Sequence, residues 1–98
     1  MNQDAFSTDF IQAHVLITGR VQGVGYRFST ATKAKTLFLQ GWVRNLPDGR
    51  VEAVFEGEKW RVEQMINWCY TGPAAAIVRD IETSYESSQG LTGFEIRY

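Results

Sequence analysis

The sequence predicts an α+β fold in which two helices cover one face of a mainly antiparallel sheet. Apolar periodicity and the intervening Gly and Pro residues divide the chain into segments in the order β-α-β-β-α-β-β. The 98 residues are 44% hydrophobic, which suits one compact core and leaves no room for a second domain. Strands joined through a helix run parallel with a right-handed crossover. This order therefore matches a ferredoxin-like sandwich with one added strand.

The first strand and the first helix flank a glycine-rich loop. A strand is predicted over 13–21, where AHVLITGRV is rich in β-branched residues and alternates between two unequal faces. A helix is predicted over 26–39, because this segment lacks Gly and Pro and places Phe28 and Phe38, with alanines between them, near helical spacing. We expect Gly41 to end this helix.

The middle of the chain predicts a β-hairpin. Residues 42–46 and 50–56 have the composition of strands, and they flank the turn Pro47-Asp48-Gly49. Each of these three turn residues has its own steric or hydrogen-bonding reason to favour a tight turn. Because a helix precedes this hairpin, its first strand should run parallel to strand 13–21.

The rest of the chain predicts a second helix and two further strands. From Glu58 onward, four apolar residues recur at i, i+3, i+4 and i+7, and the run ends at Gly72-Pro73. Strands are predicted over 76–85 and 94–98, with a polar bend at 87–90 between them. The apolar face of the second helix consists of Val62, Met65, Ile66 and Cys69.

Charge and composition argue against several classes of protein. Ten Lys and Arg residues against eleven Asp and Glu residues give a net charge of −1, so we expect no broad basic surface for nucleic acid or anionic lipid. No apolar run approaches the ~20 residues of a membrane-spanning helix. The single cysteine, Cys69, suits a reducing compartment. We expect a cytoplasmic monomer that binds neither membranes nor nucleic acid.

The N-terminal segment is expected to lie outside the domain. Residues 1–12 carry Asp4 and Asp9, and they lack both the basic region and the continuous apolar region of a signal peptide. We therefore expect a loose leader over residues 1–12, followed by a single domain over residues 13–98.

The stretch GRVQGVGYR, Gly19 to Arg27, has the composition of an anion-binding loop. Glycine permits positive φ and close approach of backbone to ligand, and the helix start behind the loop adds a positive dipole end. Arg27 can present a guanidinium fork to two phosphate oxygens. We expect inorganic phosphate or a similar anion to occupy this loop. The backbone amides that would converge on it belong to Gln22, Gly23, Val24, Gly25 and Tyr26.

Known nucleotide-binding motifs do not match this loop. A P-loop requires G-x4-G-K-[ST], but Val24 stands five residues after Gly19 and the loop contains no lysine. The dinucleotide fingerprint G-x-G-x-x-G fails because Phe28 stands three residues after Gly25. Taken alone, the loop also fits a simpler interpretation, in which the glycines only form a tight strand-to-helix turn beside a surface arginine.

Asn45 is the second candidate site residue. It lies near the end of the predicted strand 42–46, at the same edge of the sheet as the glycine-rich loop, because the two strands run parallel. A neutral amide offers a donor and an acceptor, so at this position it could hold and aim a water molecule. The alternative is local: the side chain could bond to the backbone ahead of the Pro47-Asp48-Gly49 turn.

With these motifs in place, the chain resembles the acylphosphatase family. The resemblance rests on GRVQGVGYR at 19–27, GWVRNLPDGRVE at 41–52 and FEIRY at 94–98, and the element order agrees along nearly the whole chain after the leader. It implies a small ferredoxin-like enzyme that hydrolyses the carboxyl-phosphate anhydride bond of acyl phosphates without a metal or cofactor. It further implies that Arg27 binds the phosphate and that Asn45 orients the attacking water.

The residue inventory suits that chemistry. A cysteine phosphatase would need Cys-x5-Arg, but Ala75 stands six residues after Cys69. The single histidine, His14, lies in a predicted strand, and no cluster of metal ligands is visible. Two alternatives stay open: a module that binds phosphate or carbamoyl phosphate without turnover, and an RNA-binding domain of the same architecture.

Overall fold

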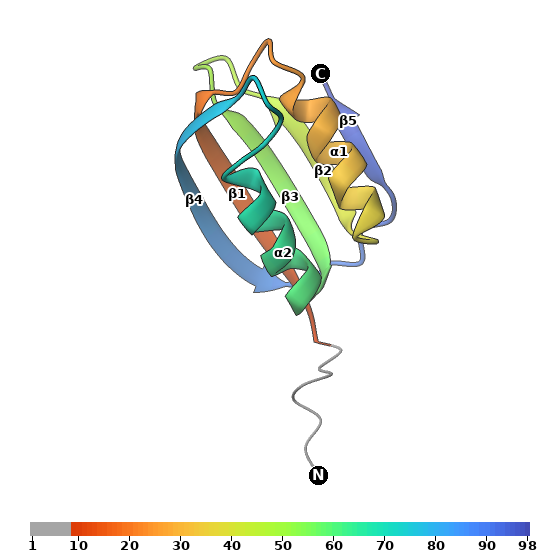
Figure 1. Cartoon of the computed structure of the whole chain (residues 1–98). Helices are drawn as coiled ribbons and strands as arrows, with labels where there is room; N and C mark the ends of the chain where they lie inside the picture. The colour runs from red at the N-terminus through yellow and green to blue at the C-terminus, as the bar shows by residue number, and fades with distance from the viewer. Residues whose placement is uncertain (1–8) are drawn as a thin grey trace.

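The computed structural model of the chain describes residues 9–98 (Figure 1). Most of the expected leader, residues 1–8, lies outside the described residues. The first strand begins at Phe10, earlier than the predicted start at residue 13. The elements are β1 (Phe10–Arg20), α1 (Tyr26–Thr36), β2 (Gln40–Asn45), β3 (Val51–Glu58), α2 (Lys59–Cys69), β4 (Ile77–Ser87) and β5 (Phe94–Arg97).

The five strands form one sheet in the order β4-β1-β3-β2-β5, and both helices cover the same face of it (Figure 1). Strand β3 pairs antiparallel with β1 and with β2, so β1 and β2 run parallel to each other, as predicted. Strand β4 pairs antiparallel with β1, whereas β5 pairs parallel with β2. The predicted ferredoxin-like fold is confirmed, and β5 is the added strand.

Side chains alternate between the two faces of the sheet along each strand, and those on one face pack against the helices. Ala13, Val15 and Ile17 of β1 are fully buried, whereas the intervening His14 and Leu16 are only partly buried. Removal of these apolar side chains from water is the main source of stability in a domain of this size. Helix α2 buries the four residues that its periodicity predicted, Val62, Met65, Ile66 and Cys69.

Helix α1 differs from its prediction in length and in its buried face. It ends at Thr36, because Phe38 adopts a left-handed backbone conformation (φ 57°) and the Leu39 N–H donates back to the carbonyl of Ala34. The side chains of Phe28 and Phe38, predicted on the apolar face, are 70% and 72% exposed. The helix packs through the two alanines that the predicted spacing includes, and through Tyr26 and Thr30, which it does not include. The buried residues are Tyr26, Thr30, Ala31 and Ala34.

The sequence predicts that Gly41 ends α1, but this prediction is wrong. Gly41 lies inside β2. Its φ is 138°, and a Cβ atom at this position would stand 1.9 Å from the carbonyl oxygen of Val54 on β3. Only glycine permits both this backbone conformation and this close approach of two strands. Gly41 therefore serves the pairing of β2 with β3.

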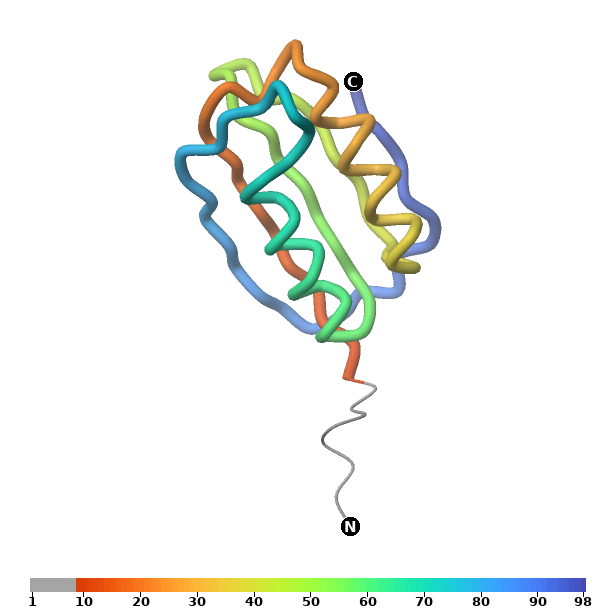
Figure 2. The backbone as a smooth tube through the Cα atoms, in the orientation of Figure 1, coloured from red at the N-terminus to blue at the C-terminus, as the bar shows by residue number. Residues whose placement is uncertain are grey.

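Three segments that are far apart in the sequence meet at one end of the sheet (Figure 2). Loop 21–25 after β1, turn 46–50 between β2 and β3, and the C-terminal end of β5 all lie at the upper end of the molecule in this view. The first turn of α1 begins there too. The parallel direction of β1, β2 and β5 causes this meeting, since parallel strands end at the same edge.

At the opposite end of the sheet, Glu56 of β3 anchors the connection between β4 and β5. Its side chain is buried; Oε2 accepts hydrogen bonds from Gln12 Nε2 at 3.0 Å and from the Gln89 N–H at 2.6 Å, and Oε1 accepts one from the Leu91 N–H at 2.7 Å. Burial alone would raise the pKa of Glu56, but these hydrogen bonds outweigh burial and hold its pKa below the ordinary value of 4.5. The carboxylate is therefore ionised and fully partnered.

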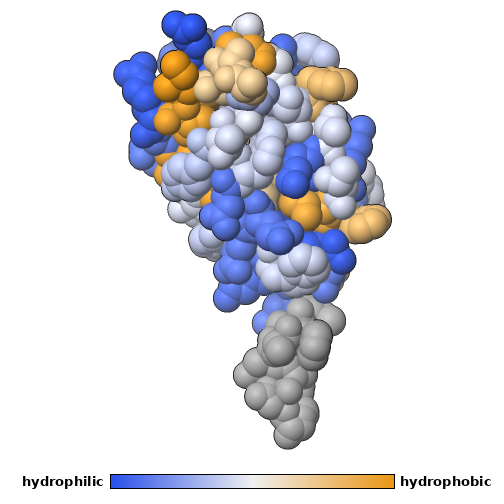
Figure 3. Space-filling view, viewed as in Figure 1, coloured by the Kyte–Doolittle hydropathy of each residue, from blue (hydrophilic) through white to orange (hydrophobic). Residues whose placement is uncertain are grey.

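The helix-covered face of the molecule has a mixed surface (Figure 3). Apolar residues form several separate patches, and polar residues lie between them. Among the described residues, no helix is long and apolar enough to cross a membrane.

Candidate active site

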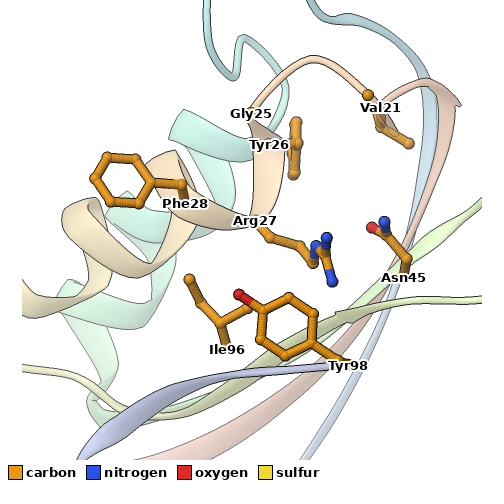
Figure 4. A pocket seen from close by; sticks show the side chains of 9 residues that line it. Val21, Gly25, Tyr26, Arg27, Phe28, Asn45, Ile96 and Tyr98 are labelled. Carbon is orange, nitrogen blue, oxygen red and sulfur yellow. The ribbon is translucent and has the colours of Figure 1, made fainter.

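A pocket opens where loop 21–25 meets the carboxyl ends of β2 and β5 (Figure 4). It has a volume of about 210 Å³. Its lining residues extend in the sequence from Val21 to Tyr98, and the parallel strand ends bring them together. The lining residues are Val21, Gly23, Gly25, Tyr26, Arg27, Phe28, Asn45, Ile96 and Tyr98.

The loop backbone and the start of α1 form one side of this pocket. Gly23 and Gly25 both adopt positive φ, 76° and 79°, and a Cβ atom at either position would meet nothing within 4 Å. The left-handed conformation, rather than a lack of space, therefore favours glycine here. Gly25 is the N-cap of α1, and no side chain caps the helix. The backbone N–H groups of the first helical turn are thus oriented toward the pocket end of the helix, where an anion would be stabilised.

Arg27 extends from the first turn of α1 into the pocket (Figure 4). Its guanidinium carbon lies 4.7 Å from the centre of the Tyr98 ring, and its Nη1 donates to the carbonyl oxygen of Arg97 at 3.3 Å. Within residues 9–98, Arg27 forms no ion pair. The C-terminal residues therefore orient the guanidinium without neutralising its charge.

Asn45, the last residue of β2, directs its amide toward the guanidinium of Arg27 (Figure 4). Its Oδ1 is buried and accepts no hydrogen bond from any residue between 9 and 98. This oxygen therefore makes no hydrogen bond to the backbone of the turn. The turn is instead supported by Asp48, whose Oδ1 accepts a hydrogen bond from the Arg50 N–H at 3.1 Å. A buried acceptor without a partner costs about 1–3 kcal/mol, so its presence in a pocket requires an explanation.

Two of the predicted loop residues do not line the pocket. The side chain of Gln22 turns toward the hairpin, where its Nε2 donates to the carbonyl oxygens of Leu46 at 2.8 Å and of Arg50 at 2.9 Å. Val24 is partly buried and packs against the core. Gly23 and Gly25, by contrast, line the pocket directly, as does Tyr26.

Tyr26 secures the start of α1 to the neighbouring helix. It is 1% exposed, its hydroxyl donates to the carbonyl oxygen of Cys69 at 2.7 Å, and its ring lies 6.0 Å from the ring of Trp68. Burial, reinforced by the contact with Cys69, raises the pKa of Tyr26 far above its ordinary value of 10.0. The phenol therefore stays protonated at neutral pH and acts as an anchor for the loop.

Ile96 and Tyr98 also line the pocket, and the sequence did not identify them as site residues. Strand β5 pairs parallel with β2 so that Arg97 stands opposite Arg44, which places Tyr98 at the level of Asn45. The alternation in FEIRY does put Ile96 and Tyr98 on one face. Their place in the pocket follows only from the strand order, which puts β5 beside β2.

The family model for acylphosphatase matches residues 13–96 of the chain. The chain belongs to the acylphosphatase family. A curated acylphosphatase from Nostoc sp. is 59% identical over 90 residues, which cover 92% of this chain and 89% of that relative. The crystal structure of acylphosphatase from Bacillus subtilis has a TM-score of 0.88 and 35% identity, and the match covers 90% of this chain and 99% of that one. Relatives of this kind are hydrolases, and so is this chain.

The acylphosphatase fold also occurs within longer proteins. The structure of T. kodakarensis HypF matches 88% of this chain with a TM-score of 0.77 and 32% identity, but this match covers only 12% of that protein. The match to named acylphosphatases, in contrast, spans most of both chains.

The other reactive side chains of this acylphosphatase-family member lie outside the pocket. His14 Nε2 contacts Glu52 Oε2 at 2.6 Å on the side of the sheet away from the helices. Cys69 is fully buried, and burial raises the pKa of its thiol to about 12. Among residues 9–98, no three His, Cys, Asp or Glu side chains lie close enough together to hold a metal ion. The chemical groups in the pocket are therefore a guanidinium, backbone amides, an amide side chain and phenols.

Proposed function

We propose that this enzyme hydrolyses acyl phosphates to a carboxylate and inorganic phosphate, by in-line attack of a water molecule and without a metal. The observation that supports this most directly is the pairing of two side chains in one pocket. Asn45 Oδ1 is buried and has no hydrogen-bond partner within residues 9–98, and it faces the guanidinium of Arg27, which forms no ion pair with those residues. The amide oxygen of Asn45 suits a water molecule, and the guanidinium of Arg27 suits a phosphate.

The phosphate group of the substrate binds between Arg27 and the start of α1. The guanidinium contacts two phosphate oxygens, and the ring of Tyr98 keeps it in the plane required for that contact. Backbone N–H groups of loop residues Gln22 to Tyr26 and of the first helical turn contact the remaining oxygens. Inorganic phosphate, the product, binds at the same place and inhibits competitively.

The attacking water is held by Asn45. Its Oδ1 accepts a hydrogen bond from the water, which satisfies the buried oxygen and directs the lone pair of the water toward phosphorus. As the new P–O bond forms, the bond from phosphorus to the acyl oxygen breaks and the carboxylate leaves with the electron pair. An oxygen of the transferred phosphate accepts the proton of the water. Arg27 and the amides stabilise the charge on the equatorial oxygens.

An acyl phosphate is the substrate that such a pocket can serve. Its leaving group is a carboxylate with a pKa near ~4, which departs as a stable anion and needs no general acid. No side-chain carboxylate, imidazole or thiol of residues 9–98 lines the pocket to act as a strong acid or base. A phosphate monoester would need more help, because its uncatalysed hydrolysis is so slow that enzymes accelerate it by up to ~10²¹-fold.

The test is hydrolysis of benzoyl phosphate by the purified full chain in EDTA, with a phosphate monoester as the control substrate. We expect hydrolysis of benzoyl phosphate to continue in EDTA, and we expect no hydrolysis of the monoester. Arg27→Ala should lower kcat/KM by at least about 10³-fold, because the charged clamp is lost. Arg79→Ala removes an exposed arginine of β4 outside the pocket and should leave kcat/KM unchanged.

Two results would overturn this proposal. If the folded wild-type chain gave no turnover, the pocket would hold phosphate without cleaving its anhydride, as in a binding module. If EDTA abolished turnover and a divalent metal restored it, the metal-free mechanism would be wrong.

The alternative of RNA binding finds little support on the uncovered face of the sheet. Strand pairing places Glu52 of β3 and Glu82 of β4 on either side of Leu16, on the face away from the helices. Arg44 on the same face already pairs with Glu52 through Nε at 2.6 Å. A surface that presents carboxylates in this way repels a phosphate backbone.

We infer that residues 13–98 form the active unit and that it works as a monomer in the cytoplasm. The described part of a single chain already brings Arg27 and Asn45 together in one pocket. The free thiol of Cys69 is buried, which suits a reducing compartment.

A further inference from the structure

Gln22 connects the two halves of the pocket through its side chain. Its amide donates one hydrogen bond to the carbonyl oxygen of Leu46 at 2.8 Å and another to that of Arg50 at 2.9 Å. A glutamine amide has two N–H donors, so both are used. These partners lie 24 and 28 residues further along the chain, in the turn between β2 and β3.

The two carbonyl groups that Gln22 contacts are the ends of that turn. The Leu46 N–H donates to Arg50 O at 2.8 Å, and the Gly49 N–H donates to Leu46 O at 3.1 Å, so the same oxygens close the turn. Gln22 therefore binds a turn that backbone hydrogen bonds already close. Leu46 directly follows Asn45, whose amide faces the pocket.

The other end of the Gln22 side chain is fixed in the loop. Its neighbours Val21 and Gly23 both line the pocket, so the Gln22 backbone lies within the segment that holds the phosphate in our proposal. Strands β1 and β2 are not neighbours, because β3 lies between them. Among residues 9–98, the two bonds of Gln22 are the hydrogen bonds that join loop 21–25 to turn 46–50.

We propose that Gln22 is a positioning residue that sets the distance between the bound phosphate and the water on Asn45. Its side chain touches neither group, since it is turned away from the pocket toward the hairpin. This inference rests on the proposed function, because it assigns a purpose to the spacing of those two groups. In-line attack requires reacting atoms about 3–3.5 Å apart, and a displacement of about 1 Å can cost 10²-fold in rate.

The test compares Gln22→Met with the wild type in benzoyl phosphate hydrolysis. Methionine keeps the length of the side chain but has no donor for either carbonyl. We expect kcat to fall by about 10- to 100-fold. The inhibition constant of inorganic phosphate should change by less than about twofold, because Arg27 and the loop amides are intact. Gln64→Met, on the exposed surface of α2, is the matched control and should leave both values unchanged.

A double-mutant cycle distinguishes positioning from general damage. If Gln22 acts through Asn45, Gln22→Met should lower kcat by less than about threefold in an Asn45→Ala background, where no water is held. Full additivity of the two substitutions would overturn the proposal. So would a weakened inhibition by phosphate that accounts for the whole loss of activity, since that would mean that the loop itself had collapsed.

A readout that does not depend on turnover separates this inference from the proposed function. In ¹⁵N NMR spectra, Gln22→Met should shift the backbone signals of Leu46 and Arg50 and the side-chain NH₂ signal of Asn45, whereas Gln64→Met should shift none of them. Unchanged signals would show that Gln22 does not hold the turn, even if the wild type proved to be inactive. Gln22→Asn keeps the amide but is one methylene shorter, so it should shift the same signals and lower kcat if the reach of the amide matters.

Discussion

Two polar side chains at opposite ends of the sheet differ in their hydrogen bonding. Glu56, which stands opposite Gln40 at the beginning of β2, has three hydrogen-bond donors for its two carboxylate oxygens. Asn45, at the end of β2, has a buried oxygen that receives no hydrogen bond from residues 9–98. Both lie in parts of the fold where burial of a polar group carries a cost.

In the function that we propose, one end of the sheet serves stability and the other serves catalysis. A fully partnered buried carboxylate secures a chain connection and offers nothing to a ligand. An unpartnered amide oxygen lowers stability slightly and offers a site for a water molecule. The side chain of Arg27, held in place by Tyr98 without a carboxylate partner, follows the same rule as Asn45.

The largest effect that tests this contrast is on catalysis. Asn45→Ala should lower kcat for benzoyl phosphate by about 10²- to 10³-fold, because the water loses its acceptor. The free energy of unfolding in urea should stay the same or rise, since the substitution removes an unsatisfied buried oxygen. A loss of stability greater than about 1 kcal/mol would show that the amide has a structural partner after all. A large rise in KM with a normal kcat would contradict its role in holding water.

A substitution of Glu56, at the other end of the sheet, should lower stability without changing kcat. Glu56→Ala should lower the free energy of unfolding by about 2–3 kcal/mol, because three hydrogen bonds to a charged group are lost. The kcat of the folded variant should remain within about twofold of the wild type, because none of the hydrogen-bond partners of Glu56 lines the pocket. Urea denaturation and benzoyl phosphate hydrolysis measure the two effects. An inactive but stable Glu56→Ala variant would reverse the contrast.

The protonation of Glu56 gives a smaller effect with a defined direction. Its pKa is held below the ordinary value of 4.5, so the carboxylate contributes stability that is fully present above about pH 4.5 and is lost as the pH falls through the lowered pKa. The difference in unfolding free energy between the wild type and Glu56→Gln should therefore shrink on acidification from pH 7 to pH 3. A difference that grew on acidification would mean that the pKa of Glu56 is raised in the folded chain.

The smallest effect concerns a second unpartnered oxygen, which lies away from the pocket. Thr30 Oγ1 on α1 is buried and makes no hydrogen bond within residues 9–98. Thr30→Val keeps the shape of the side chain and removes the hydroxyl, so it should raise the free energy of unfolding by up to about 1 kcal/mol without changing kcat. A loss of stability from this substitution would show that the hydroxyl has a partner.

The sequence predicted which segments meet at the pocket end of the sheet better than it predicted the side-chain contacts there. The parallel direction of β1 and β2 follows from the helix between them, and it places loop 21–25 and Asn45 at one edge of the sheet. The strand order does not follow from local pattern, so Tyr98 could not be assigned to the pocket. Whether the Asn45 oxygen bonds to the turn depends on side-chain geometry, which no spacing of residues determines.

Helix α1 shows why periodicity of large apolar residues was misleading. Phe28 lines the pocket with most of its ring exposed, and the ring of Phe38 lies 5.1 Å from the guanidinium carbon of Arg61. These two phenylalanines therefore have roles outside the core. Small residues such as Ala31 and Ala34 carry the packing, and they leave a weak signal in the sequence.

The central claim is that water on Asn45 attacks phosphorus, and hydrolysis of benzoyl phosphate in H₂¹⁸O tests it most directly. Mass spectrometry of the products, corrected for the uncatalysed reaction, shows which fragment receives the oxygen of water. Attack at phosphorus, as we propose, places the ¹⁸O in inorganic phosphate and leaves benzoate unlabelled. Label in benzoate would mean attack at the carbonyl carbon and would contradict the assignment of Asn45 and Arg27 to a phosphoryl-transfer site.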